Sequence, residues 1–154
     1  HRKFLKNSYK NLFNYETKIK FPNEKEVSTK IYSKTVWTFL TRVIGLVIGS
    51  KKKMDGIPKI IMKSNKKIKI AFIRGLADTD FSLVCNGSKS KISVNLNNKK
   101  IIRDSQKILQ DIGFKPYVQY DIKRFDKRYD KFWTNHYLQL SGMKNLNKWM
   151  DNIL

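Results

Sequence analysis

The chain has 154 residues, with 33 Lys and Arg against 12 Asp and Glu, and its formal net charge is +21. This length suits one compact domain rather than two large ones, and 40% hydrophobic residues in short patterned runs argue against intrinsic disorder. Because so large a positive charge destabilises a compact state by self-repulsion, it favours a polyanionic partner, and nucleic acid is the first candidate.

Cysteine content and hydropathy exclude several other classes of protein. The single Cys85 excludes an internal disulfide framework and a cysteine-rich zinc site, which fits a reducing compartment. The longest apolar stretch, residues 43–48, is far shorter than the roughly 20 residues that a membrane span requires. We therefore expect a soluble intracellular protein, cytoplasmic or organellar, with no membrane partner.

Hydrophobic spacing predicts four elements in the first part of the chain. They are a helix over residues 2–13, strands at 17–21 and 27–32, and a helix over 34–46. A basic loop over residues 49–58 follows.

A second and longer set of elements begins at Ser64, the expected N-cap of a helix that ends near Asp80. Strands at 81–86 and 91–97, a helix that stops at Gly113, strands at 116–124 and 132–140, and a terminal helix complete it. The first elements repeat only the later part of this order. We therefore predict an α+β fold of duplicated α-β-β-α-β-β-α repeats, with an incomplete first repeat at 1–63 and a second at 64–154.

The predicted strands of the second repeat have one apolar and one polar parity. Val118, Tyr120 and Ile122 are apolar positions expected to face helices, and His136 is expected to be packed among them. The opposite parity carries amides, hydroxyls and lysines, which suit base edges and phosphates in a DNA groove, although any one-sided sheet has a polar solvent face. The predicted DNA-binding residues are Lys30, Ser82, Val84, Asn86, Lys89, Lys91, Ser93, Asn95, Tyr117, Gln119, Lys123, Asn135, Tyr137 and Gln139.

The helix that ends near Asp80 carries two further signals. Ala71, Gly75 and Thr79 are small residues at i, i+4 and i+8, a spacing that lets a second helix approach closely. Asp78 and Asp80 lie at the helix C-terminus, where a carboxylate faces the negative end of the helix dipole. A divalent cation with oxygen ligands would compensate them, and the alternative is a capping or lysine-paired role.

At this point the residues resemble a known family. The segment Ile73–Asp80, IRGLADTD, is similar to the motif of the LAGLIDADG homing endonucleases. The upstream Ile57-Pro58 pair, the hairpin that follows the motif and the order of elements from Ser64 onward resemble the family's second repeat. The resemblance covers nearly the whole chain and implies an endonuclease that hydrolyses both strands of double-stranded DNA with Mg²⁺ or another divalent cation.

The resemblance also implies roles for individual residues. In the family, two motif helices pack together, and each contributes its last acidic residue to the metal ions; here that residue is Asp80, as both catalytic residue and metal ligand. By the same match Ala71, Gly75, Asp78 and Thr79 belong to the packed helix. The family's central basic residue corresponds to one of three candidates, Lys51, Lys52 and Lys53.

Two departures from the family pattern leave alternatives open. Phe81 stands where a glycine is expected after the last acidic residue, and the sequence contains only one acidic motif. We therefore expect a segment before His1, or a second chain, to supply the other motif helix. The alternative function is a DNA- or RNA-binding relative that does not cleave, such as a maturase or a regulator. The resemblance implies an association with an intron or intein, and an intein-borne and a free-standing enzyme look alike in this region.

Overall fold

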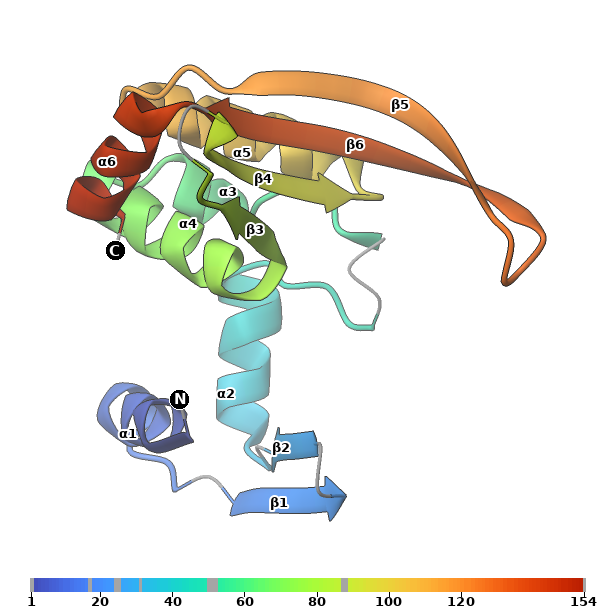
Figure 1. Ribbon diagram of the computed structural model, residues 1–154. Helices are drawn as coiled ribbons and strands as arrows, with labels where there is room; N and C mark the ends of the chain where they lie inside the picture. The colour runs from blue at the N-terminus through green and yellow to red at the C-terminus, as the bar shows by residue number, and fades with distance from the viewer. Residues whose placement is uncertain are drawn as a thin grey trace. The chain divides into compact units, whose positions relative to one another are not determined.

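The computed structural model describes residues 2–16, 18–23, 26–30, 32–49, 53–86 and 89–153, with the backbone alone for 2–6, 18–23 and 26–30 (Figure 1). The chain divides into two compact units, residues 1–45 and 46–154. The predicted repeat boundary at 63/64 stays a prediction. In this division residues 46–58 fall in the same compact unit as the acidic motif.

The first unit contains a two-stranded antiparallel sheet and two helical segments. Its elements are α1 (Arg2–Phe13), β1 (Lys18–Asn23), β2 (Glu26–Lys30), α2 (Lys34–Thr38) and the π-helix η1 (Phe39–Val43). The helix predicted over 34–46 is therefore α-helical only as far as Thr38, and it continues as a π-helix from Phe39 to Val43. The Thr41 hydroxyl donates to the carbonyl of Trp37 at 2.8 Å, and such back-bonding competes with regular α-helical hydrogen bonds.

The second unit follows the predicted order from the motif helix onward. Its elements are α3 (Lys59–Met62), α4 (Lys66–Asp80), β3 (Phe81–Val84), β4 (Lys91–Leu96), α5 (Lys99–Asp111), β5 (Tyr117–Asp126), β6 (Lys131–Ser141) and α6 (Met143–Asn152). The four strands pair antiparallel in the order β3-β4-β6-β5. The α+β fold class is thus confirmed, and α3 is an additional short helix.

Local sequence explains most of the helix ends, with one correction. The N-cap of α4 is Asn65, whose side chain accepts from the Ile68 N–H at 3.1 Å, and the prediction of Ser64 is wrong by one residue. Ser64 instead lies in the turn between α3 and α4, where its hydroxyl donates to the carbonyl of Ile61. After the C-terminal end of α5, Gly113 adopts the left-handed backbone that was predicted for it, with φ +91°.

The core lies between the helices and one face of the four-stranded sheet. Ile73 of α4, Ile102 of α5 and Leu138 of β6 are completely buried, and Ile92 and Val94 of β4 face the same layer. Removing these side chains from water supplies the main driving force for folding the unit. The opposite face of the sheet is left for polar side chains, as predicted.

A β-bulge interrupts the pairing of β5 with β6. Gln119 lies opposite Tyr137, but Ile122 lies opposite Asn135, so β5 contains one extra residue. Asp121 has a left-handed φ of +58° at this point. A bulge of this kind exchanges the two faces of a strand for every residue that follows it.

The predicted faces of β5 are consequently wrong beyond the bulge. Lys123 was predicted to lie on the polar face of the sheet. It pairs with Thr134 and therefore lies on the opposite face, the one that the helices cover closer to the core. Ile122 and Arg124 occupy the polar face instead, because the extra residue reverses the alternation. The β5–β6 hairpin then runs on beyond the rest of the sheet (Figure 1).

Candidate functional site

Helix α4 is held by its inner face and presents its C-terminal end at the surface of the second unit. Ile73 is completely buried, and the Arg74 side chain donates to the carbonyl of Ile153. The helix ends at Asp80, as predicted, and this residue is half-buried. The Thr79 hydroxyl donates to the Asp80 carboxylate over 2.9 Å, so that the carboxylate is oriented by its neighbour.

Phe81, the departure from the family pattern, does not disturb the helix end. Its backbone is extended, with φ −89° and ψ 149°, so no glycine is needed to turn from α4 into β3. The ring stacks on Trp149 with centroids 5.7 Å apart and joins the edge of the core. The large side chain therefore anchors the end of the motif helix.

A pocket of about 690 Å³ lies along the outer face of α4 and contains Asp80. Its walls come from three segments that are distant in sequence: α4, the loop before α3, and the connection from β4 to α5. The lining residues are Met54, Ile57, Ala71, Phe72, Gly75, Leu76, Thr79, Asp80, Asn95, Leu96, Asn97, Asn98 and Ile101. The pocket thus brings Asp80 together with Asn95, a predicted DNA-binding residue, whereas Asp78 is exposed outside the lining.

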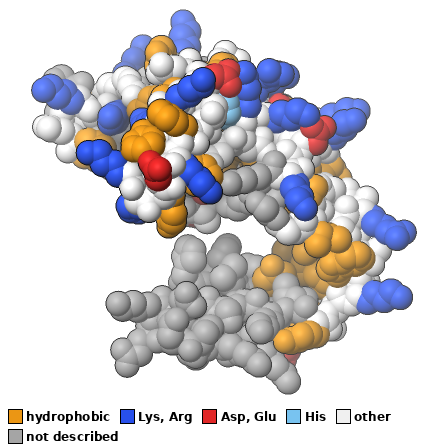
Figure 2. All heavy atoms as spheres, turned by 90° about the vertical axis from the view of Figure 1, so that its right-hand side faces the viewer, with side chains coloured by type: hydrophobic (Ala, Val, Ile, Leu, Met, Phe, Trp, Pro, Cys, Tyr) orange, Lys and Arg blue, Asp and Glu red, His pale blue; other side chains and the backbone are white. Residues whose placement is uncertain are grey.

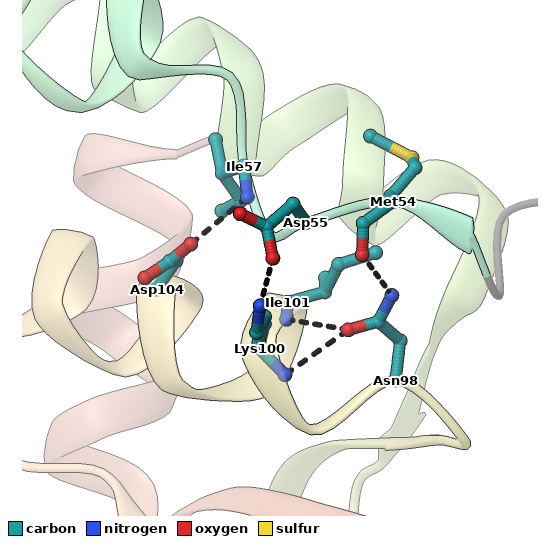
Figure 3. A network of polar contacts seen from close by, with 7 residues as sticks. All are labelled: Met54, Asp55, Ile57, Asn98, Lys100, Ile101 and Asp104. Carbon is teal, nitrogen blue, oxygen red and sulfur yellow. Dashed lines mark hydrogen bonds and ion pairs between the residues drawn. The ribbon is translucent and has the colours of Figure 1, made fainter. Parts of the chain in front are cut away.

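The loop wall of the pocket is fixed to the start of α5, as Figure 3 shows. Asn98 accepts from the N–H groups of Lys100 and Ile101 at 3.0 and 3.1 Å and so caps the helix. Its amide nitrogen also donates to the carbonyl of Met54 at 2.8 Å. One side chain therefore caps α5 and ties the loop to it.

Two more interactions complete this attachment. The Ile57 N–H donates to the Asp104 carboxylate at 2.9 Å, and Lys100 forms an ion pair with Asp55 (Figure 3). Gly56, with φ +96°, lies so close to the Asp104 carboxylate that a Cβ atom would overlap it. The backbone of this loop is therefore fixed where it borders the pocket.

This attachment bears on the three candidate basic residues. Lys53 is exposed and directly precedes Met54 of the pocket wall. Lys51 and Lys52 lie outside the described residues.

The α4 wall differs from the loop wall. Ala71 and Gly75 are exposed there, and apart from its chain neighbours and the backbone of α4 itself, no atom of the described residues lies within 4 Å of the place where a Cβ on Gly75 would be. Small residues with open space beside them allow another helix to approach. The predicted packing face is thus present on the surface of this unit.

The polar face of the sheet carries most of the predicted DNA-binding residues. Those that are exposed on it or in the adjoining turn are Ser82, Val84, Asn86, Lys89, Asn95, Tyr117 and Gln119. Those that are half-buried are Lys91, Asn135, Tyr137 and Gln139. Ser93 is buried between Ser82 and Gln139 of the neighbouring strands, which leaves it little surface for a ligand. Lys30 lies in β2 of the other unit, where the backbone alone is described.

Hydrogen bonds within the polar face restrict one of these residues. The Tyr137 hydroxyl donates to the amide oxygen of Gln139, and the amide nitrogen of Gln139 donates to Ser141. Gln139 must exchange these bonds before it can bind a base edge. Asn95 and Gln119 are more exposed and are the stronger candidates for reading bases.

Arg124 is a candidate site residue that the sequence analysis missed. It borders a second pocket of about 540 Å³ together with Asn97, Trp133 and Asn135. The signal was Asp121, because aspartate is one of the few residues that adopt a left-handed backbone readily, and in the middle of a strand this indicates a bulge.

Electrostatic interactions stabilise the bulge. Lys99 donates to the Asp121 carboxylate, and this bond holds the pKa of that carboxyl below its usual value. His136 is buried as predicted, and its Nδ1 accepts from the Asp121 N–H at 3.0 Å. Burial lowers the pKa of His136, against the opposing effect of the nearby Asp121 carboxylate. The imidazole is therefore neutral where it holds the bulge.

A cluster of metal ligands and a membrane-spanning helix are both absent from the described part of the chain. No three His, Cys, Asp or Glu residues within it come close enough to hold a metal ion together. None of its helices is long and apolar enough to cross a membrane.

Comparison with known proteins gives one family and one fold. The family model described as a LAGLIDADG-like domain matches residues 67–153, more than half of the chain. The solved structure of I-DmoI with DNA and Mn shares 17% identity and a TM-score of 0.66, over 100% of this chain and 72% of that chain. I-DmoI with DNA and Ca also gives 17% and 0.66, over 100% and 67%. No curated protein matches the sequence.

Proposed function

The chain belongs to the family of LAGLIDADG-like domains, and from this premise we propose that it is a site-specific endonuclease of double-stranded DNA that depends on a divalent cation. The observation that carries the proposal is the pocket that contains both Asp80 at the end of the motif helix and Asn95 on the polar sheet face. Solved proteins of the same fold are described with DNA and with Mn, Ca or Mg. We expect the protein to be intracellular and associated with an intron or intein.

DNA binding would combine two kinds of contact. The exposed amides of Asn95 and Gln119 suit base edges in the major groove, and Arg124 suits a guanine or a phosphate. Lysines at the edge of the polar sheet face, such as Lys89 just before β4 and Lys91 at its start, suit phosphates and would contribute affinity without sequence preference. The net charge of +21 supports this electrostatic contribution.

The donor groups fit a magnesium ion in part. Mg²⁺ keeps several waters and is usually held by one or two carboxylates together with substrate phosphates. Asp80 offers one half-buried carboxylate, oriented by Thr79. A bound ion would supply an activated water and stabilise the leaving oxygen.

The remaining groups of the chain have positioning and electrostatic roles in this proposal. Lys53, or its neighbours Lys51 and Lys52, would neutralise charge that develops on the phosphate. A second acidic helix, from a segment before His1 or from a second chain, would pack on the open face at Ala71 and Gly75. That helix would bring the second carboxylate that the metal site requires.

A non-cleaving binder, such as a maturase or a regulator, is the second candidate. It is favoured by one observation, that the described residues contain no cluster of three metal-ligating side chains. In this case the polar face would bind nucleic acid, and Asp80 would have no catalytic role.

Two assays on the purified protein separate these functions. Incubation with randomised duplexes in Mg²⁺, followed by sequencing of the new ends, should give ends on both strands of one preferred sequence and none in EDTA. Duplex binding should fall with salt at a log–log slope of about −5 to −7, as expected if roughly 6–8 phosphates are contacted. Binding with this slope but without new ends would favour the second candidate, and a shallow slope would contradict both.

A further inference from the structure

The outer end of the β5–β6 hairpin carries exposed aromatic side chains that the proposed endonuclease does not use. Residues 122–133 follow the bulge and extend past the helices that cover the sheet nearer the core (Figure 1). Figure 2 views the molecule from this side and shows hydrophobic side chains exposed among Lys and Arg side chains.

Two phenylalanines form an exposed pair on this hairpin. Phe125 lies directly opposite Phe132, with ring centroids 5.0 Å apart, and the two residues are 48% and 72% exposed. The bulge creates the pair, because without the extra residue the two side chains would lie on opposite faces. Tyr129 in the turn is 62% exposed. Hydrophobic stabilisation grows with the apolar area removed from water, so rings this exposed are not explained by a role in the core.

The surroundings of the pair are strongly cationic. Residues 122–133 contain five Lys or Arg and two Asp. Asp126 is bound by Arg128 through Nε and Nη2, at 3.0 and 2.8 Å, and these bonds hold the pKa of Asp126 below its usual value. The Arg128 guanidinium also lies over the Tyr129 ring, 5.5 Å from its centroid. The net charge of the tip therefore suits a polyanion and disfavours a cationic partner.

Exposed rings beside cations are the chemistry that binds unpaired nucleotides. Unpaired bases stack on aromatic side chains, and cations follow the phosphates. A paired duplex offers no free base faces along its length, so the rings would gain little from it. An apolar protein surface could cover the rings but would leave the cations uncompensated.

We propose that the tip of the β5–β6 hairpin binds an unpaired stretch of nucleic acid, with the Phe125–Phe132 pair stacking on its bases and Lys123, Lys127 and Lys131 near its phosphates. The site is separate from Asp80 and its pocket. It does not rest on DNA cleavage and can be tested without it.

The test measures the affinity of the full chain for labelled oligothymidylate and oligouridylate of about 12 nucleotides, within the range of single-strand sites. A duplex of mixed sequence is measured in parallel. The variants are the double substitution Phe125→Leu with Phe132→Leu, which keeps apolar bulk but removes both rings, and Phe132→Tyr, which keeps the ring. Tyr32→Leu is the matched control, because Tyr32 is 69% exposed and lies in the first unit.

We expect the double Leu variant to lose about tenfold or more in single-strand affinity, while duplex affinity changes by less than about twofold. The Phe132→Tyr variant and the Tyr32→Leu control should keep single-strand affinity. The oligonucleotide that binds with the higher affinity shows whether the unpaired nucleic acid is DNA or RNA.

Three outcomes would overturn the proposal. They are no binding of either oligonucleotide, single-strand affinity unchanged in the double variant, and an equal loss for duplex and single strand. If sedimentation shows that the wild type self-associates, and that only the double variant does not, while single-strand affinity is kept, the pair is a protein contact instead.

Discussion

The two walls of the Asp80 pocket are built in opposite ways. The loop wall, residues 53–58, is attached to α5 by one hydrogen bond that Asn98 donates and one that Asp104 accepts, and its Gly56 has no room for a side chain. The α4 wall presents Gly75 with open space beside it. The loop wall is fixed by contacts within the chain, whereas the α4 wall is open to contact with another helix.

The largest effect is expected at the attached wall. Gly56→Ala should lower the free energy of unfolding by about 2–4 kcal/mol, because the new Cβ atom requires a strained backbone and displaces the Asp104 carboxylate from the Ile57 N–H. Urea unfolding followed by circular dichroism measures the change. A loss below about 0.5 kcal/mol would mean that the loop is not fixed as described.

Asn98 tests the same wall with two substitutions. Asn98→Ala should lower the free energy of unfolding by about 2 kcal/mol, because α5 loses its cap and Met54 loses its hydrogen bond. Asn98→Asp keeps the capping oxygen and removes only the donor to Met54, so a loss of about 1 kcal/mol is expected. No loss for Asn98→Asp in urea unfolding would show that the bond to Met54 contributes nothing, and equal losses for the two variants would show that the cap contributes nothing.

The open wall should respond in the opposite direction. Gly75→Ala is expected to raise the free energy of unfolding by up to about 1 kcal/mol, because alanine favours a helix interior and its Cβ would meet no described residue beyond the backbone of α4 itself. The same substitution should weaken any assembly that uses this face, which sedimentation or a cleavage assay detects. A marked loss of stability in the isolated chain would show that Gly75 packs within its own fold.

The smallest effect concerns the bulge. Because the pKa of His136 is lowered in the folded protein, the unfolded state binds the proton more readily. Stability should be fully present above the ordinary histidine pKa of 6.5 and should fall as the pH decreases below it. The urea concentration at the midpoint of unfolding is measured from pH 7.5 to 5. It should decrease less in His136→Gln than in the wild type. An identical decrease would assign the effect to other groups.

The sequence predicts the parts of this molecule that depend on local patterns. The end of α4 at Asp80 is confirmed: small residues recur at helical spacing as far as Thr79, and β3 begins directly after Asp80. The hairpin of β3 and β4 is confirmed because alternation and turn residues lie within one short segment.

Other features depend on contacts between distant residues. The bulge requires His136 to reach the backbone of Asp121, and the alternation of β5 alone does not show it. For this reason Lys123 was placed on the wrong face and Arg124 was missed. The hydrogen bond between Asn98 and Met54 joins positions 44 residues apart, so the hydrophobic periodicity of the sequence does not predict it.

The most direct test concerns Asp80, for which we propose a divalent ion at the junction of protein and DNA. Duplex affinity is measured at constant ionic strength with Ca²⁺ and with EDTA, for the wild type, Asp80→Asn and the control Asp78→Asn. Ca²⁺ should tighten binding by the wild type and by Asp78→Asn about fivefold, because it removes the repulsion between Asp80 and phosphate, worth about 1 kcal/mol. Asp80→Asn should bind as tightly in EDTA as in Ca²⁺. An Asp80→Asn variant that responds to Ca²⁺ as the wild type does would contradict the proposed role of this carboxylate.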